Sequence, residues 1–69
     1  MIQRVKLVRI AQGYPSYKFA AQVSVHPNLW REIEIGMRKP SDKVILRASQ
    51  ILKRSAAKLF TDVEEALVR

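Results

Sequence analysis

The sequence predicts an all-α fold, a compact arrangement of five short helices. Apolar residues recur at helical spacing along most of the 69 residues, and no stretch alternates strictly between apolar and polar residues as a strand would. Serine, proline and glycine, which start and stop helices, interrupt this pattern at short intervals. Hydrophobic residues make up 48% of the chain, which favours a folded core over disorder. A chain of this length is expected to form one domain.

The first two helices are predicted in the N-terminal third. Apolar residues spaced as on one helix face extend from residue 2 to about residue 12, and Gly13 follows as a stop signal. After Pro15, which disfavours a helical residue before it, Ser16 is a suitable N-cap. The second helix is therefore expected over residues 17–23.

A third helix is expected after a break of only two or three residues. Pro27 suits its first turn, where a missing N–H costs no hydrogen bond, and His26 stands at the cap position. Gly36 ends the helix, which then covers residues 27–35. Two short helices joined by so short a break form the helix-turn-helix signature, here over about residues 16–35.

Two further helices complete the predicted fold. Ser41 caps a fourth helix over about residues 42–52, and Ser55 caps a fifth. Residues 61–65 are expected to be helical, either as a continuation of the fifth helix or as a new one. The predicted organisation is a helix-turn-helix domain over residues 1–60 and a C-terminal helical tail over residues 61–69.

The distribution of charge indicates a polyanionic partner. Thirteen Lys and Arg against six Asp and Glu give a net charge of +7. Residues 1–54 carry a net +8 and residues 55–69 a net −1. Such an excess on a small domain points most often to nucleic acid, and less often to an anionic membrane surface. Alternatively, the excess of cations could belong to ordinary solvated helix faces without any polyanionic partner. The regular turn signals disfavour a membrane-surface helix.

The composition supports few other classes of function. The chain has no cysteine, so it cannot form a disulfide, a thiolate metal site or a cysteine nucleophile, and its single histidine is too few for a zinc site. No pattern of paired carboxylates indicates an enzyme, so we expect no catalytic residue, metal or cofactor. The apolar runs are too short to span a membrane and the charged N-terminus is unlike a signal peptide, so a cytoplasmic location is expected.

Two stretches carry a resemblance to a known family. Residues 13–26, and above all the block Ile33-Glu34-Ile35-Gly36-Met37-Arg38-Lys39-Pro40-Ser41, resemble the Cro/phage-repressor (Xre-type) helix-turn-helix family. That family commonly reads I-E-x-G-x-R-x-P-S in this block. The resemblance covers about residues 2–60. Departures are Ser16 for a common glutamine, Ser24 for the usual turn glycine, Trp30 for a smaller aliphatic residue and Asp42 for a frequent leucine.

The resemblance implies a sequence-specific regulator of transcription, expected to be a repressor that binds a double-stranded DNA operator. The third helix would lie in the major groove. The resemblance also implies an ion pair between Arg9 and Glu34. The alternative is a protein-interaction module on a helix-turn-helix scaffold that does not bind DNA, because Pro27, Leu29 and Ile35 make the third helix more apolar than usual.

Residue roles follow from the predicted helix faces. The face of the third helix expected to be exposed also includes Ile35, whereas Leu29, Trp30 and Ile33 should turn inward. Hydrogen-bonding groups there can read base edges, and cations and helix N-termini can hold phosphates. The predicted base contacts are His26, Pro27, Asn28, Arg31 and Glu32. The predicted phosphate contacts are Ser16, Tyr17, Lys18, Arg38 and Lys39.

The remaining aromatic and apolar residues suggest two further roles. Exposed aromatic rings can stack on single-stranded bases. Phe19 and Trp30 fall at core positions, which disfavours this role for them, whereas Tyr17 falls at an exposed position near the expected DNA backbone. Leu59, Val63 and Leu67 share one helical face with Phe60 beside them. This stripe is the candidate dimerisation element of a homodimer, which could form only on DNA. The alternative is that the stripe packs on the domain's own core.

Overall fold

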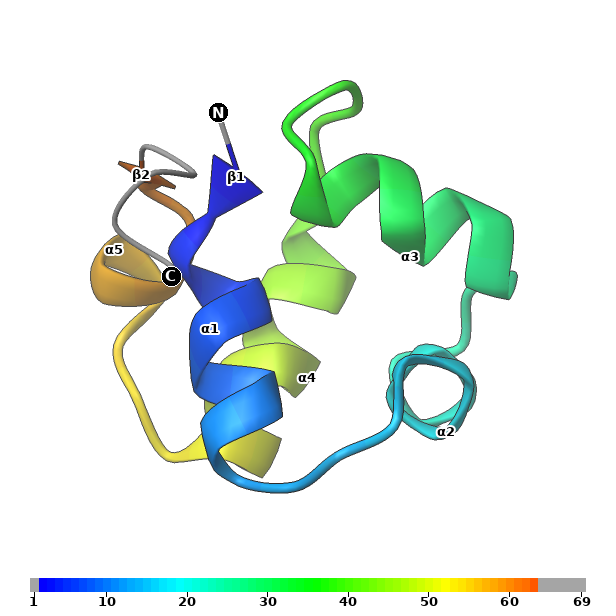
Figure 1. The fold of residues 1–69 in the computed structure, drawn as a ribbon, viewed down its shortest axis with the longest axis horizontal. Helices are drawn as coiled ribbons and strands as arrows, with labels where there is room; N and C mark the ends of the chain where they lie inside the picture. Colours follow the sequence, from blue (N-terminus) through cyan, green and yellow to red (C-terminus); the bar gives the residue numbers. More distant parts are fainter. Residues whose placement is uncertain (1, 64–69) are drawn as a thin grey trace.

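A computed structural model describes residues 2–63 and shows five helices and a two-stranded antiparallel sheet. The five predicted helices are thus confirmed: the first four lie within about two residues of their expected bounds, and the fifth follows Ser55 as expected. In chain order the elements are β1 (Ile2–Gln3), α1 (Arg4–Ala11), α2 (Ser16–Gln22), α3 (Pro27–Glu34), α4 (Asp42–Leu52), α5 (Ala56–Leu59) and β2 (Asp62–Val63), as Figure 1 shows.

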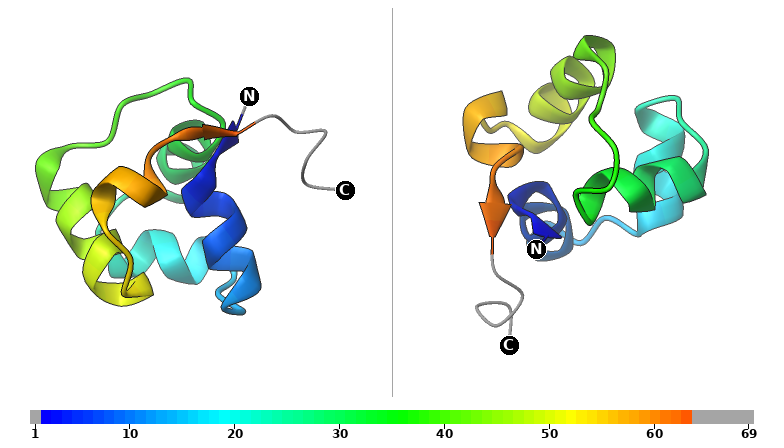
Figure 2. Two further views of the ribbon diagram at one scale, coloured as in Figure 1. Left: turned by 90° about the vertical axis from the view of Figure 1, so that its left-hand side faces the viewer. Right: turned by 90° about the horizontal axis from the view of Figure 1, so that it is seen from above.

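The helices are grouped around α1 and α4. In Figure 1, α5 and β2 lie to one side of α1, β1 lies above the start of α1, and the α2–α3 pair lies to the other side. Seen from above in Figure 2, α4 lies behind α1 and closes the space between the two groups. The helix-turn-helix unit therefore projects from one side of the molecule and leaves the outer surfaces of α2 and α3 open.

The core draws side chains from all five helices. Phe19 of α2 and Trp30 of α3 are fully buried at its centre, and their ring centroids lie 4.8 Å apart. Val5 from α1, Leu52 from α4 and Leu59 from α5 complete the same cluster. The two aromatic rings thus pack against each other inside the fold, as expected, and neither is available to stack on a base.

The ends of the described chain differ from the prediction. Ile2 pairs with Val63 and Gln3 pairs with Asp62, so residues 2–3 form a strand and α1 begins only at Arg4. The expectation of helix at residues 61–65 is wrong for Asp62 and Val63, which form β2. The pairing satisfies backbone groups of both segments, and the Gln3 amide also donates to the Asp62 carboxylate. A two-residue strand is too short to show any alternation in the sequence.

The helix starts are mostly capped as predicted. His26 caps α3 through Nδ1, which accepts from the Asn28 backbone N–H at 3.1 Å, and Ser41 Oγ accepts from the Val44 N–H at 3.3 Å at the start of α4. Ser55 holds the N-cap position of α5 without a side-chain hydrogen bond. Ser16 was expected to be an N-cap but is the first residue of α2, because Pro15 takes the cap position.

The turn between α2 and α3 holds Ser24 in a left-handed conformation, with φ at +61°. A Cβ in that region crowds the following carbonyl, at a cost of roughly 1–2 kcal/mol. We therefore expect Ser24→Gly to raise the melting temperature, by about 4–8 °C for each kcal/mol recovered. Ser55→Gly, at φ −68°, is the matched control and should lower it slightly by adding freedom to the unfolded chain. A Ser24→Gly protein that melts at or below the wild-type temperature would contradict this assignment of strain.

Candidate nucleic-acid interface

The exposed surface of α3 carries the predicted base-contacting residues. His26, Pro27, Asn28 and Arg31 are exposed and Glu32 is half-buried. Trp30 and Ile33 are buried and Leu29 packs partly against the core, which confirms the expected orientation of the helix. Ile35 was expected on the exposed face but is half-buried.

The start of α3 presents polar groups in a fixed arrangement. Because His26 Nδ1 accepts the Asn28 backbone N–H, a neutral imidazole carries its proton on Nε2 and can donate outward. The Asn28 carboxamide makes no hydrogen bond within residues 2–63, so its donor and acceptor are both available to a ligand. A carboxamide free in this way can bind adenine N6 and N7 together.

Glu32 and Arg38 form an exposed ion pair that the sequence analysis did not predict. Arg38 Nε donates to Glu32 Oε2 at 3.0 Å, while Oε1 stays outside this contact. The pair forms because Gly36, at φ +81°, reverses the chain after α3, and the Met37 N–H donates back to the Glu32 carbonyl at 2.9 Å. The Gly36 signal predicts this reversal, and with it the return of residue 38 toward α3.

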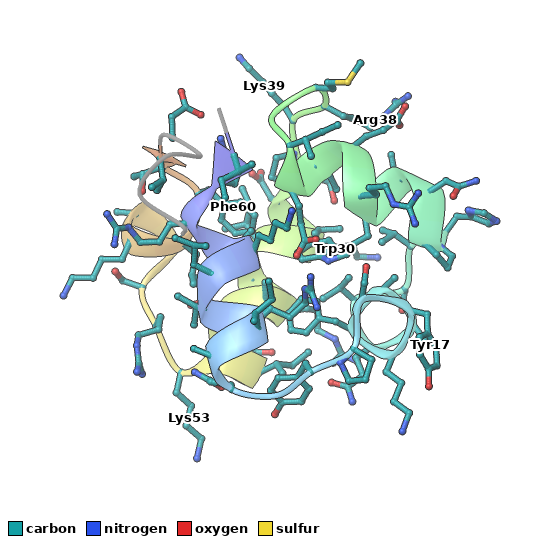
Figure 3. All side chains as sticks on the ribbon, in the orientation of Figure 1. Tyr17, Trp30, Arg38, Lys39, Lys53 and Phe60 are labelled. Atoms are coloured by element: carbon teal, nitrogen blue, oxygen red, sulfur yellow. The ribbon has the colours of Figure 1, made fainter. Side chains whose placement is uncertain are left out.

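Cations and hydroxyls of the predicted phosphate-contacting set lie on both sides of α3. Tyr17 and Lys18 are exposed in the first turns of α2, where Ser16 is half-buried. Arg38 and Lys39 are exposed in the loop beyond the other end of α3. Figure 3 shows Tyr17 on one side of α3 and the Arg38–Lys39 loop on the other, so α3 lies between two groups able to hold phosphates.

A buried ion pair attaches α3 to α1. Arg9 Nε donates to Glu34 Oε2 at 2.7 Å and Nη2 donates to Oε1 at 3.3 Å, so the expected Arg9–Glu34 pair is confirmed. Arg9 Nη1 also donates to the Tyr14 carbonyl at 2.7 Å, in the segment before α2. Only 7% of Arg9 and 3% of Glu34 are exposed. One guanidinium therefore fixes both helices of the helix-turn-helix unit relative to α1.

The candidate dimerisation stripe is largely internal. Leu59 is fully buried in the core and Val63 is buried against β1, so assigning these two residues to a dimer contact was wrong. They pack inward because α5 ends at Leu59 and the chain then pairs with β1 instead of continuing as a helix. Phe60 is half-buried against the core. Leu67 lies outside the described residues.

Two other kinds of feature are absent from the described residues. Residues 2–63 contain no cluster of three or more His, Cys, Asp or Glu side chains placed to hold a metal ion. No helix in this part of the chain is both long enough and apolar enough to cross a membrane. Comparisons of the chain with protein-family models, with curated proteins and with solved structures find no significant match.

Proposed function

We propose that this protein is a sequence-specific double-stranded DNA-binding regulator of transcription, with a Cro/repressor-like fold and α3 as its recognition helix. One observation supports the proposal most. Exposed side chains that can bind base edges line α3 between two groups that can hold phosphates, and a buried ion pair fixes α3 to the rest of the fold. A recognition helix needs this combination of base readout and phosphate positioning.

The direct base contacts are assigned to the exposed side of α3. Asn28 binds adenine through its free carboxamide, and Glu32 Oε1 accepts from cytosine N4 while Arg38 neutralises the carboxylate. Arg31, exposed and without an ion-pair partner in residues 2–63, reaches guanine or a phosphate. His26 donates from Nε2, and Pro27 contacts a thymine methyl. The phosphate contacts are assigned to Ser16, Tyr17, Lys18, Arg38 and Lys39.

The alternative, a protein-interaction module without DNA binding, is less well supported. Such a module would present an apolar surface on α3. The large apolar residues that are exposed within the described chain are Ile10, Tyr17, Met37 and Leu46, and none of them belongs to α3. Leu29 and Ile35, which made α3 look apolar in the sequence, are half-buried. Of the residues that α3 leaves exposed, Pro27 is apolar, whereas Asn28 and Arg31 are polar.

We propose further that two copies bind one operator as a homodimer and act as a repressor. A two-fold arrangement would place two α3 helices one helical turn apart, about 34–36 Å, in successive major grooves. With Leu59 and Val63 internal, the contact between copies must use other residues.

A salt titration tests DNA binding directly. If each subunit neutralises about six phosphates, log K against log salt concentration should fall with a slope near −5 for each bound subunit, and about twice that for the proposed homodimer. Raising the salt from about 50 to 200 mM should then weaken binding by roughly 10³-fold for each bound subunit. Fluorescence anisotropy of a labelled duplex provides the measurement. A slope near zero would exclude duplex DNA as the main partner and favour the protein-interaction module.

A further inference from the structure

A second group of cations lies away from α3. Arg4 at the start of α1 and Lys58 of α5 line the same open hollow. Lys53 and Arg54 occupy the segment between α4 and α5. In Figure 3 Lys53 points away from the side that holds α3 and the Arg38–Lys39 loop, and Figure 1 places α5 opposite α2 and α3. We name Arg4, Lys53, Arg54 and Lys58 the α5 face.

The cations of the α5 face take part in no ion pair within residues 2–63. The sequence has no acidic residue between Asp42 and Asp62. The Asp62 carboxylate accepts from the Gln3 amide, and the ion pairs within residues 2–63 involve none of the four α5-face residues. Like charges gathered on one surface attract a polyanion to it. The α3 interface, on the other side, does not use them.

The backbone of Lys53 has a conformation that is unusual for a lysine. Its φ of +56° and ψ of +45° place it in the left-handed region, at the end of α4 where glycine is favoured. Arg54 Nη1 donates to the Lys53 carbonyl at 3.0 Å, and Ser49 Oγ donates to the Arg54 carbonyl at 2.6 Å. A glycine would adopt this conformation more easily, so Lys53 carries a local strain that its side-chain charge could justify.

We propose that the α5 face binds the phosphate backbone of a second DNA duplex while α3 binds its operator, so that the protein bridges two duplexes. This proposal rests on the DNA binding proposed above. The molecule measures about 29 × 23 × 21 Å, and duplex DNA is stiff over roughly 150 base pairs. One short duplex therefore cannot bend around to reach both faces, and the second occupant is a separate duplex.

The composition of the α5 face favours DNA over a lipid surface. Peripheral membrane binding is strengthened by large apolar side chains that enter the bilayer beside the cations. Around Arg4 and Lys58 the hollow is lined by Ala57 and Thr61, and the exposed large apolar residues of the described chain all lie outside residues 53–58. Contacts to phosphates alone need no such residues and do not depend on base sequence.

A capture experiment tests the bridge. A short duplex carrying the preferred site is immobilised, the protein is added, and a fluorescent duplex lacking that site is then offered. Wild-type protein should capture the second duplex, and Lys53→Gln/Lys58→Gln should capture at least about tenfold less while its salt slope for capture falls by about two. Anisotropy should show that this variant still binds the operator duplex within about threefold of wild type, since α3 binds that duplex and lies on the side opposite α5.

Two variants separate the proposal from plainer explanations. Lys43→Gln/Arg47→Gln removes the same charge from the hollow beside Ser24 and should leave capture of the second duplex unchanged. Lys53→Gly should raise the melting temperature but weaken capture of the second duplex. If Lys53 served only to end α4, the substitution would not weaken capture. Sedimentation should show the same oligomeric state for all these variants.

The outcomes are distinguishable. Three results would each overturn the bridge and leave the role of α3 intact. The first is that wild-type protein binds its operator but captures no second duplex. The others are equal capture by the α5-face variant and its control, and preferential capture of RNA or of phosphatidylserine vesicles. Failure of wild-type protein to bind the first duplex would instead overturn the function assigned to α3, and the bridge with it.

Discussion

Replacing either member of the Arg9–Glu34 pair is expected to destabilise the protein by about 3–5 kcal/mol, because the remaining partner becomes an uncompensated buried charge. A domain of this size has roughly that much stability in total. Arg9→Met and Glu34→Leu should therefore be largely unfolded at 25 °C. Arg9→Met/Glu34→Leu should recover much of the loss, since both charges leave together. Melting followed by the fluorescence of Trp30, which is buried in the folded chain, measures each variant.

The exposed pair provides a matched control for the buried one. Glu32→Leu and Arg38→Met make the same substitutions at a pair whose side chains are 41% and 56% exposed. Each should change stability by less than about 1 kcal/mol. The recovery in the buried double variant should be incomplete, because the Tyr14 carbonyl also loses its donor. Losses at Arg9 and Glu34 that simply add in the double variant would show that the two residues stabilise the fold independently.

Asn28→Ala is expected to weaken binding to the preferred site by about 1–3 kcal/mol and to relax the preference at one base pair. The reason is the loss of a bidentate contact, since the Asn28 side chain makes no other hydrogen bond in residues 2–63. Lys39→Ala should instead weaken all sequences nearly equally and lower the salt slope by about one. Anisotropy titrations on the preferred and on single-substituted duplexes measure both effects.

The control for Asn28→Ala removes an equivalent carboxamide elsewhere. Gln50 is exposed on α4, so Gln50→Ala should leave both affinity and base preference unchanged. Circular dichroism should show wild-type helix content for both variants, because the Asn28 backbone N–H keeps its bond to His26. Equal effects of Asn28→Ala and Gln50→Ala would remove Asn28 from the interface.

Local signals made the helices predictable. Pro27 behind the His26 cap, Ser41 as the N-cap of α4 and Gly36 as the stop after α3 each act within a few residues along the chain. The orientation of α3 followed from the spacing of Trp30 and Ile33. The Arg9–Glu34 pair is different, because its members are 25 residues apart and it was expected from the family resemblance alone.

Contacts between distant residues account for the errors. Pairing of Ile2 with Val63 joins the two ends of the described chain, and no local pattern encodes it. That pairing also turns Val63 inward and removes it from the expected dimer stripe. The Glu32–Arg38 pair depends on how the chain reverses at Gly36, and charge counts alone do not show which cations meet a carboxylate. The separation of the α5 face from α3 likewise emerged only in three dimensions.

Selection of bound duplexes from a random library tests the central claim most directly. The wild-type protein should enrich one sequence motif, with two related half-sites about 10–10.5 base pairs apart, as expected for paired recognition helices in successive major grooves. Repeating the selection with Asn28→Ala should yield the same motif with the preference lost at one position in each half-site. Two results would contradict the assignment of α3 as the helix that reads the bases. One is that the wild-type protein enriches no sequence from the library. The other is that both Asn28→Ala and Glu32→Ala leave the selected motif unchanged.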